Sequence, residues 1–279
     1  MRLAVWRPPP DLEPWLSAAI AFEAAGPVPD WSPTRFPASL ASALVVVSTG
    51  RFAVPVGHGW QALPTAFVGG PALAPVTLYR TPTFRCWGVM VRPAAAATLL
   101  GESPAALVQA FQPAGDVFGS RWTPLEQRLA QAHSPEDAFT SLFSFLRGRV
   151  AHHRHAARRD AVLALQADAL GGAASSGPGA RQFQRRFSAG LGLRPKLFQR
   201  LARAEGAMRD LLAHGRFDAD LALRHGYFDQ SHLGRDFRLL AGASPGSLLK
   251  AVRSADLAHW PLLAGARYPE AGIRPDFPA

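Results

Sequence analysis

The sequence predicts an α+β protein, with a small antiparallel β-barrel and some helices in its N-terminal half and an all-α C-terminal half. Between about residues 33 and 93, short runs rich in Val, Phe, Trp and Thr alternate with Gly, Pro and Ser, as in antiparallel strands joined by turns. Beyond residue 150, apolar residues recur at the helical spacings of three and four. A chain of 279 residues is long enough for two domains. We expect them at 1–150 and 151–254, followed by an irregular tail at 255–279.

Five runs in the first domain are predicted to be strands, because their β-branched and aromatic residues are bounded by turn residues. They are Ala43–Ser48, Phe52–Val56, Thr65–Val68, Thr77–Tyr79 and Cys86–Val91. Their close spacing indicates a small antiparallel barrel or sandwich.

Three helix starts are expected after these strands. Ser103-Pro104 begins the first, and Thr123 to Glu126 has the spacing of a capping box. Ser134-Pro135 begins a helix over 135–149, which is our candidate for a dimer surface. One side of this helix is apolar: Phe139, Leu142, Phe143 and Leu146.

A helix-turn-helix is predicted between Asp218 and Leu249. Asp218 or Asp220 can cap the first helix and Asp229 the second, because a carboxylate accepts the unpaired amide protons at a helix start. Gly226 allows the left-handed turn between them. We expect Tyr227 and Phe228 to anchor this turn. Ser244-Pro245 begins a third, bracing helix, and the core face of the second helix is expected to be Leu233, Phe237 and Leu240.

The other face of the second helix has the side chains of a DNA reader. Gln230, Ser231, His232, Arg235 and Arg238 lie off the apolar stripe, and Gln and Arg can pair with adenine and guanine edges in the major groove. Gly234 is expected on the same face, where it would allow a close approach to the duplex. The alternative with the same periodicity is a helical hairpin with a solvated polar face.

The segment HGYFDQSHLGRDFRLLAGASP resembles the second helix-turn-helix of the AraC/XylS family of bacterial transcription regulators. The matching positions are Gly226-Tyr227, Asp229, Gln230-Ser231, Leu233, Arg235-Asp236-Phe237 and Gly242 to Pro245. The resemblance implies two helix-turn-helix units joined by a long linker helix, and a cupin-like N-terminal domain that binds an effector or dimerises. Residues 88–119 resemble a poorly characterised sensor domain of such proteins, from which no ligand-binding residue can be carried over.

The first unit is similar to the family over Ala180–Leu212. Phe183 and Phe187 would face the core, and Pro195-Lys196 would open the linker helix. The outward, DNA-reading residues would be Arg181, Gln184 and Arg185. The family has a regular helix before this segment, but here the run Gly171 to Gly179 contains four glycines and a proline, which disfavour a helix. We therefore expect a short, distorted or missing supporting helix.

The net charge is also divided unequally between the two halves of the chain. Residues 1–150 contain 11 Lys or Arg and 9 Asp or Glu, whereas residues 151–279 contain 19 and 11. Most of the net charge of +10 is therefore expected on the C-terminal half, as contacts with DNA phosphates require.

The barrel offers candidates for a small-molecule site, but none can be assigned. Its aromatic candidates are Trp60, Phe67, Tyr79, Phe84 and Trp87, and its polar candidates are His58, Arg80, Arg85 and Arg92. Apolar walls with an arginine would suit a small organic acid or an aromatic compound. The alternative is that the aromatic residues only fill the core.

Enzyme, metal and redox chemistry have little support. His58 has no partner at ligand spacing, and His152, His153 and His155 have no Cys or acidic partners; we interpret this histidine cluster as a solvated basic segment between the domains. Cys86, the only cysteine, is expected to be a buried thiol. We expect no cofactor, no metal, no membrane span and a cytoplasmic location.

The sequence thus predicts a sequence-specific DNA-binding transcription regulator, not an enzyme, controlled by a ligand or partner at its N-terminal domain. The expected partners are double-stranded DNA, a small-molecule effector, RNA polymerase and a second copy of the chain. The alternative is an effector-binding or protein-interaction module with a degenerate DNA-binding half. Operator, effector and activator or repressor role stay open.

Overall fold

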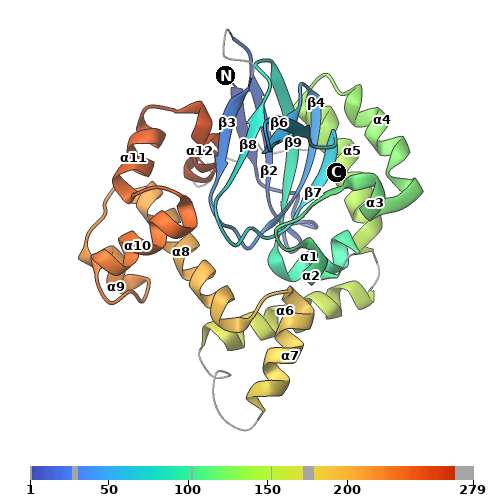
Figure 1. Ribbon diagram of the computed structural model, residues 1–279. Helices are drawn as coiled ribbons and strands as arrows, with labels where there is room; N and C mark the ends of the chain where they lie inside the picture. Colours follow the sequence, from blue (N-terminus) through green and yellow to red (C-terminus); the bar gives the residue numbers. More distant parts are fainter. Residues whose placement is uncertain (1, 27–30, 102, 152, 172–178, 268–279) are drawn as a thin grey trace.

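The computed structural model describes residues 2–26, 31–101, 103–151, 153–171 and 179–267. Two antiparallel sheets form the N-terminal domain, a six-stranded sheet with the order β1-β2-β9-β4-β7-β10 and a four-stranded sheet with the order β3-β8-β5-β6 (Figure 1). The strands are β1 Arg2–Trp6, β2 Leu16–Ala24, β3 Ser32–Phe36, β4 Ser42–Thr49, β5 Phe52–Val56, β6 Gly59–Ala62, β7 Ala66–Gly69, β8 Val76–Arg80, β9 Phe84–Val91 and β10 Phe111–Pro113. The α+β prediction is confirmed.

All five predicted strands are present, as β4, β5, β7, β8 and β9. The other five strands were not predicted from the sequence. β2 is rich in alanine, a helix former, yet it pairs with both β1 and β9 in the larger sheet. β3 contains Pro33, and it lies at an edge of the smaller sheet, where a missing amide proton breaks no ladder.

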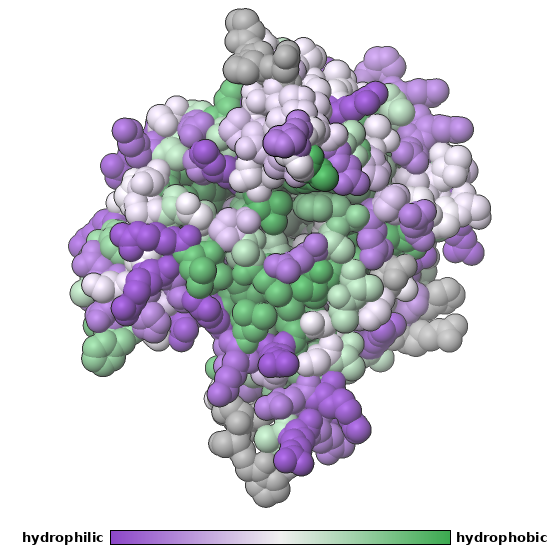
Figure 2. Space-filling model, viewed as in Figure 1, coloured by the Kyte–Doolittle hydropathy of each residue, from purple (hydrophilic) through white to green (hydrophobic). Residues whose placement is uncertain are grey.

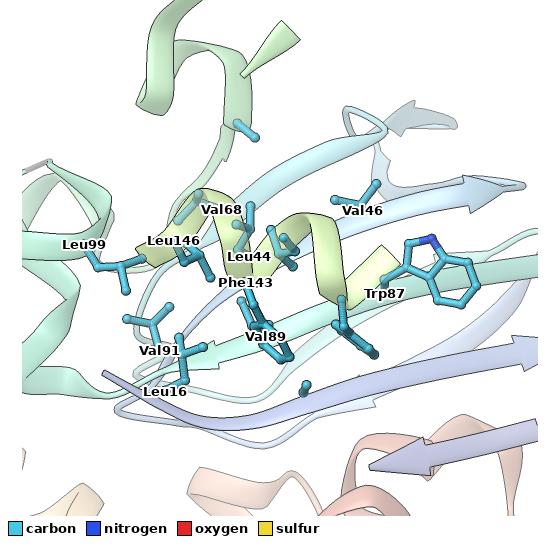
Figure 3. Packing of buried hydrophobic residues seen from close by; sticks show 14 of the residues in the cluster. Leu16, Leu44, Val46, Val68, Trp87, Val89, Val91, Leu99, Phe143 and Leu146 are labelled. Atoms are coloured by element: carbon cyan, nitrogen blue, oxygen red, sulfur yellow. The ribbon is translucent and has the colours of Figure 1, made fainter. Parts of the chain in front are cut away.

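Five helices cover the larger sheet and one end of the domain: α1 Pro93–Leu100, α2 Pro104–Leu107, α3 Ala114–Phe118, α4 Thr123–Ala130 and α5 Pro135–Val150. The predicted apolar side of α5 is fully buried. Figure 3 shows Phe143 and Leu146 of α5 against Leu44 and Val89 of the sheet. At the start of α5, Ser134 Oγ accepts a hydrogen bond from the Asp137 amide at 3.1 Å, as predicted.

The capping box predicted at Thr123 is wrong. A 3-10 turn at Gly119–Arg121 leads into α4, and Trp122 has helical dihedral angles before Thr123 is reached. Thr123 is therefore already inside the helix and caps nothing.

The C-terminal half is helical: α6 His153–Leu170, α7 Ala180–Leu191, α8 Pro195–His214, α9 Ala219–Arg224, α10 Gln230–Ala241, α11 Pro245–Arg253 and α12 Trp260–Arg267. The basic segment predicted as a solvated linker is helical from His153 onward. The tail is not irregular throughout either, because its described part forms a 3-10 turn at Leu257–His259 and α12. None of the described helices is long and apolar enough to cross a membrane.

The C-terminal helices lie against the barrel. In Figure 1, α12 lies between the strands and α11, and α8 runs from beside α10 and α11 toward α6 and α7. The amide of Ala38 donates to the carbonyl of Leu240 at 2.6 Å, and the amide of Leu40 donates to Glu205 Oε1 at 2.6 Å. The loop between β3 and β4 therefore contacts both the linker helix and the end of α10.

Candidate DNA-binding site

The second helix-turn-helix comprises α9, the turn at Gly226 and α10. Asp218, rather than Asp220, caps α9 by accepting from the Leu221 amide at 2.9 Å. Gly226 has a φ of +68°, which glycine adopts without strain. Asp229 accepts from the His232 amide and so caps α10, as expected. Ser244 caps α11 by accepting from the Ser247 amide at 3.2 Å.

The predicted apolar stripe of α10 is buried. Leu233 and Phe237 pack in a core with Met208 and Leu211 of α8 and Leu248 of α11, and Leu240 packs toward the first unit. This core holds α10 against the linker helix, so that the opposite face of α10 is turned outward.

The predicted DNA-reading residues of α10 differ in their exposure and in their contacts with the rest of the protein. Ser231, Arg235 and Arg238 are exposed, and their spacings of four and three place them in one row. Gln230 is exposed, but its Nε2 donates to the Phe217 carbonyl at 3.0 Å. His232 is half-buried, with its ring 5.1 Å from the ring of Tyr227.

Two expectations for this unit are wrong. Gly234 is buried rather than on the outward face, since a Cβ built there would be 3.7 Å from Cζ of Phe217. It therefore provides no approach to DNA. Phe228 does not anchor the turn, because 87% of it is exposed. Tyr227 alone anchors it, buried under Arg203, whose guanidinium carbon is 4.7 Å from the ring centre.

Asp236 is a structural residue of the site for which no role was predicted from the sequence. It is only 4% exposed, and Arg200 of α8 donates to its Oδ1 from Nη2 at 2.7 Å and from Nε at 3.2 Å. This hydrogen bonding raises the pKa of Arg200. The pair joins α10 to the linker helix. The only sequence signal for this ion pair was an acidic residue between two positions of the motif, because its partner Arg200 is 36 residues away in the chain.

The first unit presents α7 in a similar way. Arg181, Gln184 and Arg185 are exposed, as is Arg186, which the prediction omitted. Phe187 is buried and Phe183 is half-buried, 5.7 Å from it between ring centres.

The support for α7 comes from α6. Val162 and Leu165 of α6 approach within 3.3 and 3.7 Å of a Cβ built on Gly190. The prediction of a short, distorted or missing supporting helix is therefore wrong, because α6 is an 18-residue helix that precedes α7 and packs against it. Residues 172–178, the glycine-rich run on which that prediction rested, lie outside the described residues.

Residues 173–251 match the model of a helix-turn-helix domain family, and this segment spans both units. The C-terminal domain is an AraC-type helix-turn-helix domain. This match supports DNA binding by the C-terminal half of the chain.

Three solved structures similar to this chain are of ToxT from Vibrio cholerae. That of strain O395 has 8% identity and a TM-score of 0.39, covering 83% of this chain and 96% of that one. The 1.65 Å structure of ToxT has 10% sequence identity and a TM-score of 0.42, and the match covers 83% of this chain and 97% of that one. The structure of ToxT bound to (E)-4-(8-methylnaphthalen-1-yl)but-3-enoic acid has 9% sequence identity and a TM-score of 0.40, and the match covers 89% of this chain and 98% of that one. No curated protein matches the chain.

In the barrel, most of the candidate ligand-binding residues are exposed, or pack against or hydrogen-bond with other residues of the chain. Arg85 pairs with Glu23 at 2.8 Å, and Arg92 donates to the carbonyls of Glu13 and Leu16. His58 is exposed. Trp60 is partly exposed, near Trp31 and Tyr79. Among the aromatic candidates, Phe67, Phe84 and Trp87 are buried.

Arg80 is the exception, because it is buried and its Nε and Nη1 have no hydrogen-bond partner among the described residues. Cys86 is also buried, and burial raises the pKa of its thiol to about 12. It is therefore a protonated, unreactive group at neutral pH. Among the described residues, no group of three His, Cys, Asp or Glu side chains could hold a metal ion.

Proposed function

We propose that this regulator reads DNA through α10, with α7 as a second reading helix. The observation that supports this most strongly is the exposed row Ser231, Arg235 and Arg238, on the side of α10 away from its buried stripe. Arginine can bind guanine O6 and N7 with two hydrogen bonds. Gln230 and His232 lie at the N-terminal end of the same helix, where they would contact the edge of the same base segment.

The second segment of the operator would be contacted by Arg181, Gln184 and Arg185 of α7. The linker helix α8 has 20 residues and is therefore about 30 Å long. One helical turn of DNA is about 34 Å. A linker of this length supports an operator with two segments on one face of the duplex, one for each unit.

Control by the N-terminal domain is supported by its contacts with the DNA-binding helices. The hydrogen bonds from Ala38 to Leu240 and from Leu40 to Glu205 link the barrel to α10 and α8. A small-molecule effector that moved this loop would change the position of α10 relative to α7. RNA polymerase is a further proposed partner, and the cytoplasm is the proposed compartment.

We keep α5 as the proposed dimer contact. Its outward face presents Thr140, Ser144 and Gly148, so a dimer formed there would use small and polar side chains.

The experiment that tests the function is a selection of DNA sequences, followed by binding to every single-base variant of the selected site. Arg235→Ala should lose about 1–3 kcal/mol at one base position. The matched control is Arg224→Ala, which removes the same charge from an exposed residue of α9 and should weaken binding equally on all sequences. An Arg235→Ala protein that binds every variant as the wild type does would contradict the proposal. Failure to recover any motif would favour an interaction module with a degenerate DNA-binding half.

A further inference from the structure

Arg80 is a charged side chain inside the apolar core of the barrel. It is the last residue of β8 and is only 1% exposed. It shares the interior face of the strand with Leu78, two residues earlier, and its guanidinium carbon is 5.6 Å from the centre of the Phe22 ring. Nε and Nη1 have no hydrogen-bond partner, and no carboxylate of the described residues forms an ion pair with it.

This arrangement leaves a positive charge without compensation. Burial lowers the pKa of Arg80, but a guanidinium stays protonated in proteins. The neighbouring thiol of Cys86 is neutral, because its pKa is raised to about 12. An unpaired charge in an apolar core is strongly unfavourable. The described chain therefore lacks the anion that this position requires.

Two further buried donors lie on the same side of the barrel core. Thr34 of β3 stands opposite Leu78 in the ladder, so it is diagonal to Arg80 on the interior face, and its Oγ1 has no partner. Trp260 of α12 stacks on Phe22 at 4.5 Å, and its Nε1 also has no partner. The guanidinium and the indole thus both lie next to the Phe22 ring.

We infer that the interior of the barrel is the binding site for a small organic acid. Its carboxylate accepts hydrogen bonds from Arg80, and its apolar body lies along Phe22 toward Trp260. This inference rests on the proposed function, because it names the chemical class of the effector.

Helix α12 connects this site to the DNA-binding half. The rings around Arg80 are almost fully buried, so a ligand can enter only if one of the elements that enclose this site moves. Helix α12 is the enclosing element that belongs to neither sheet. Trp260 and Leu263 of α12 pack in the barrel core, whereas Leu262 packs with α8 and α10. Figure 1 shows α12 between the strands and α11. Entry of the acid therefore displaces α12 and changes how the second helix-turn-helix packs against the barrel.

The first test uses the full-length protein without DNA. Binding of benzoate, hexanoate and decanoate is measured by calorimetry, with the corresponding amides as uncharged probes. At least one acid should bind the wild type, and its amide should not. Arg80→Met should lose about 10- to 100-fold in affinity, since hydrogen bonds to a charged group are removed. The matched control is Arg85→Met, an arginine of the neighbouring sheet paired with Glu23, which should bind the acid as the wild type does.

A second readout needs no ligand. Arg80→Met removes the unpaired charge, so the variant should unfold at a higher temperature than the wild type. A lower unfolding temperature would show that Arg80 serves stability, and it would overturn the inference. So would the failure of all three acids to bind, or equal binding by Arg80→Met.

Coupling is tested with Trp260→Ala. This variant should bind the acid more tightly than the wild type, because the indole no longer has to be displaced. Acid should change the DNA affinity of the wild type and change that of Trp260→Ala less. Acid binding through Arg80 without any DNA binding would overturn only the proposed function. DNA binding without acid binding would overturn only the inference.

Discussion

Removing the carboxylate of Asp236 should loosen α10 from the linker helix. The side chain is 4% exposed and accepts two hydrogen bonds from Arg200 at 2.7 and 3.2 Å. Breaking a fully buried ion pair costs about 3–5 kcal/mol. The side chain of Arg200 is 39% exposed, so its freed guanidinium can be hydrated, and solvent already screens part of the interaction. For Asp236→Ala we therefore expect a loss of about 2 kcal/mol in the free energy of unfolding.

The assay is urea unfolding followed by circular dichroism, together with binding to the selected DNA site. The matched control is Asp220→Ala, which removes the same charge from an exposed position on α9. Both variants gain one positive charge, which by itself favours DNA binding. Asp236→Ala should nevertheless bind the site more weakly than Asp220→Ala, because its recognition helix is less well oriented. Equal unfolding midpoints and equal DNA affinities for the two variants would refute this account of the Arg200–Asp236 pair.

Three further predictions follow from other contacts. Gly234→Ala should stabilise the protein by about 0.5–1 kcal/mol and leave DNA affinity unchanged, because the added Cβ meets Phe217 at an ordinary contact distance of 3.7 Å. Thermal unfolding measures the gain in stability, and weaker DNA binding by the variant would contradict the prediction. Glu205→Gln should keep an acceptor for the Leu40 amide, whereas Glu205→Ala should cost about 1–3 kcal/mol. Burial raises the pKa of the Glu205 carboxyl above its ordinary value. Its contribution to stability is therefore greatest below that ordinary value and is lost as the pH rises through the raised pKa; a Glu205→Gln protein with the same pH profile of stability as the wild type would contradict this. Phe228→Ser should leave the unfolding midpoint unchanged, since the ring is exposed, and a destabilised variant would show a contact that the structure lacks.

The second helix-turn-helix could be predicted from local signals. Asp229, Gly226 and the stripe of Leu233 and Phe237 act within one or two turns of the chain, so caps, turn and core face follow from spacing alone. The same spacing misplaced Gly234. A glycine off the main stripe was expected outside, but Phe217 folds over it from the turn before α9.

The parts that escaped prediction depend on distant partners. The alanine-rich β2 is a strand only because β1 and β9 flank it, and tertiary pairing overrides propensity there. Helix α12 is held by Phe22 and Phe36, more than two hundred positions earlier in the chain. Arg80 was one of four equal candidates in the sequence, and only its burial without a partner distinguishes it.

The most direct test of the central claim is selection of genomic DNA by the purified full-length protein at two salt concentrations. The account predicts a motif of two segments about one helical turn apart, bound more weakly at the higher salt. Arg235→Ala should relax one base position in one segment, and Arg185→Ala should affect only the other. Salt-sensitive binding without any motif would contradict the claim that α10 and α7 read bases, and would leave only a basic surface.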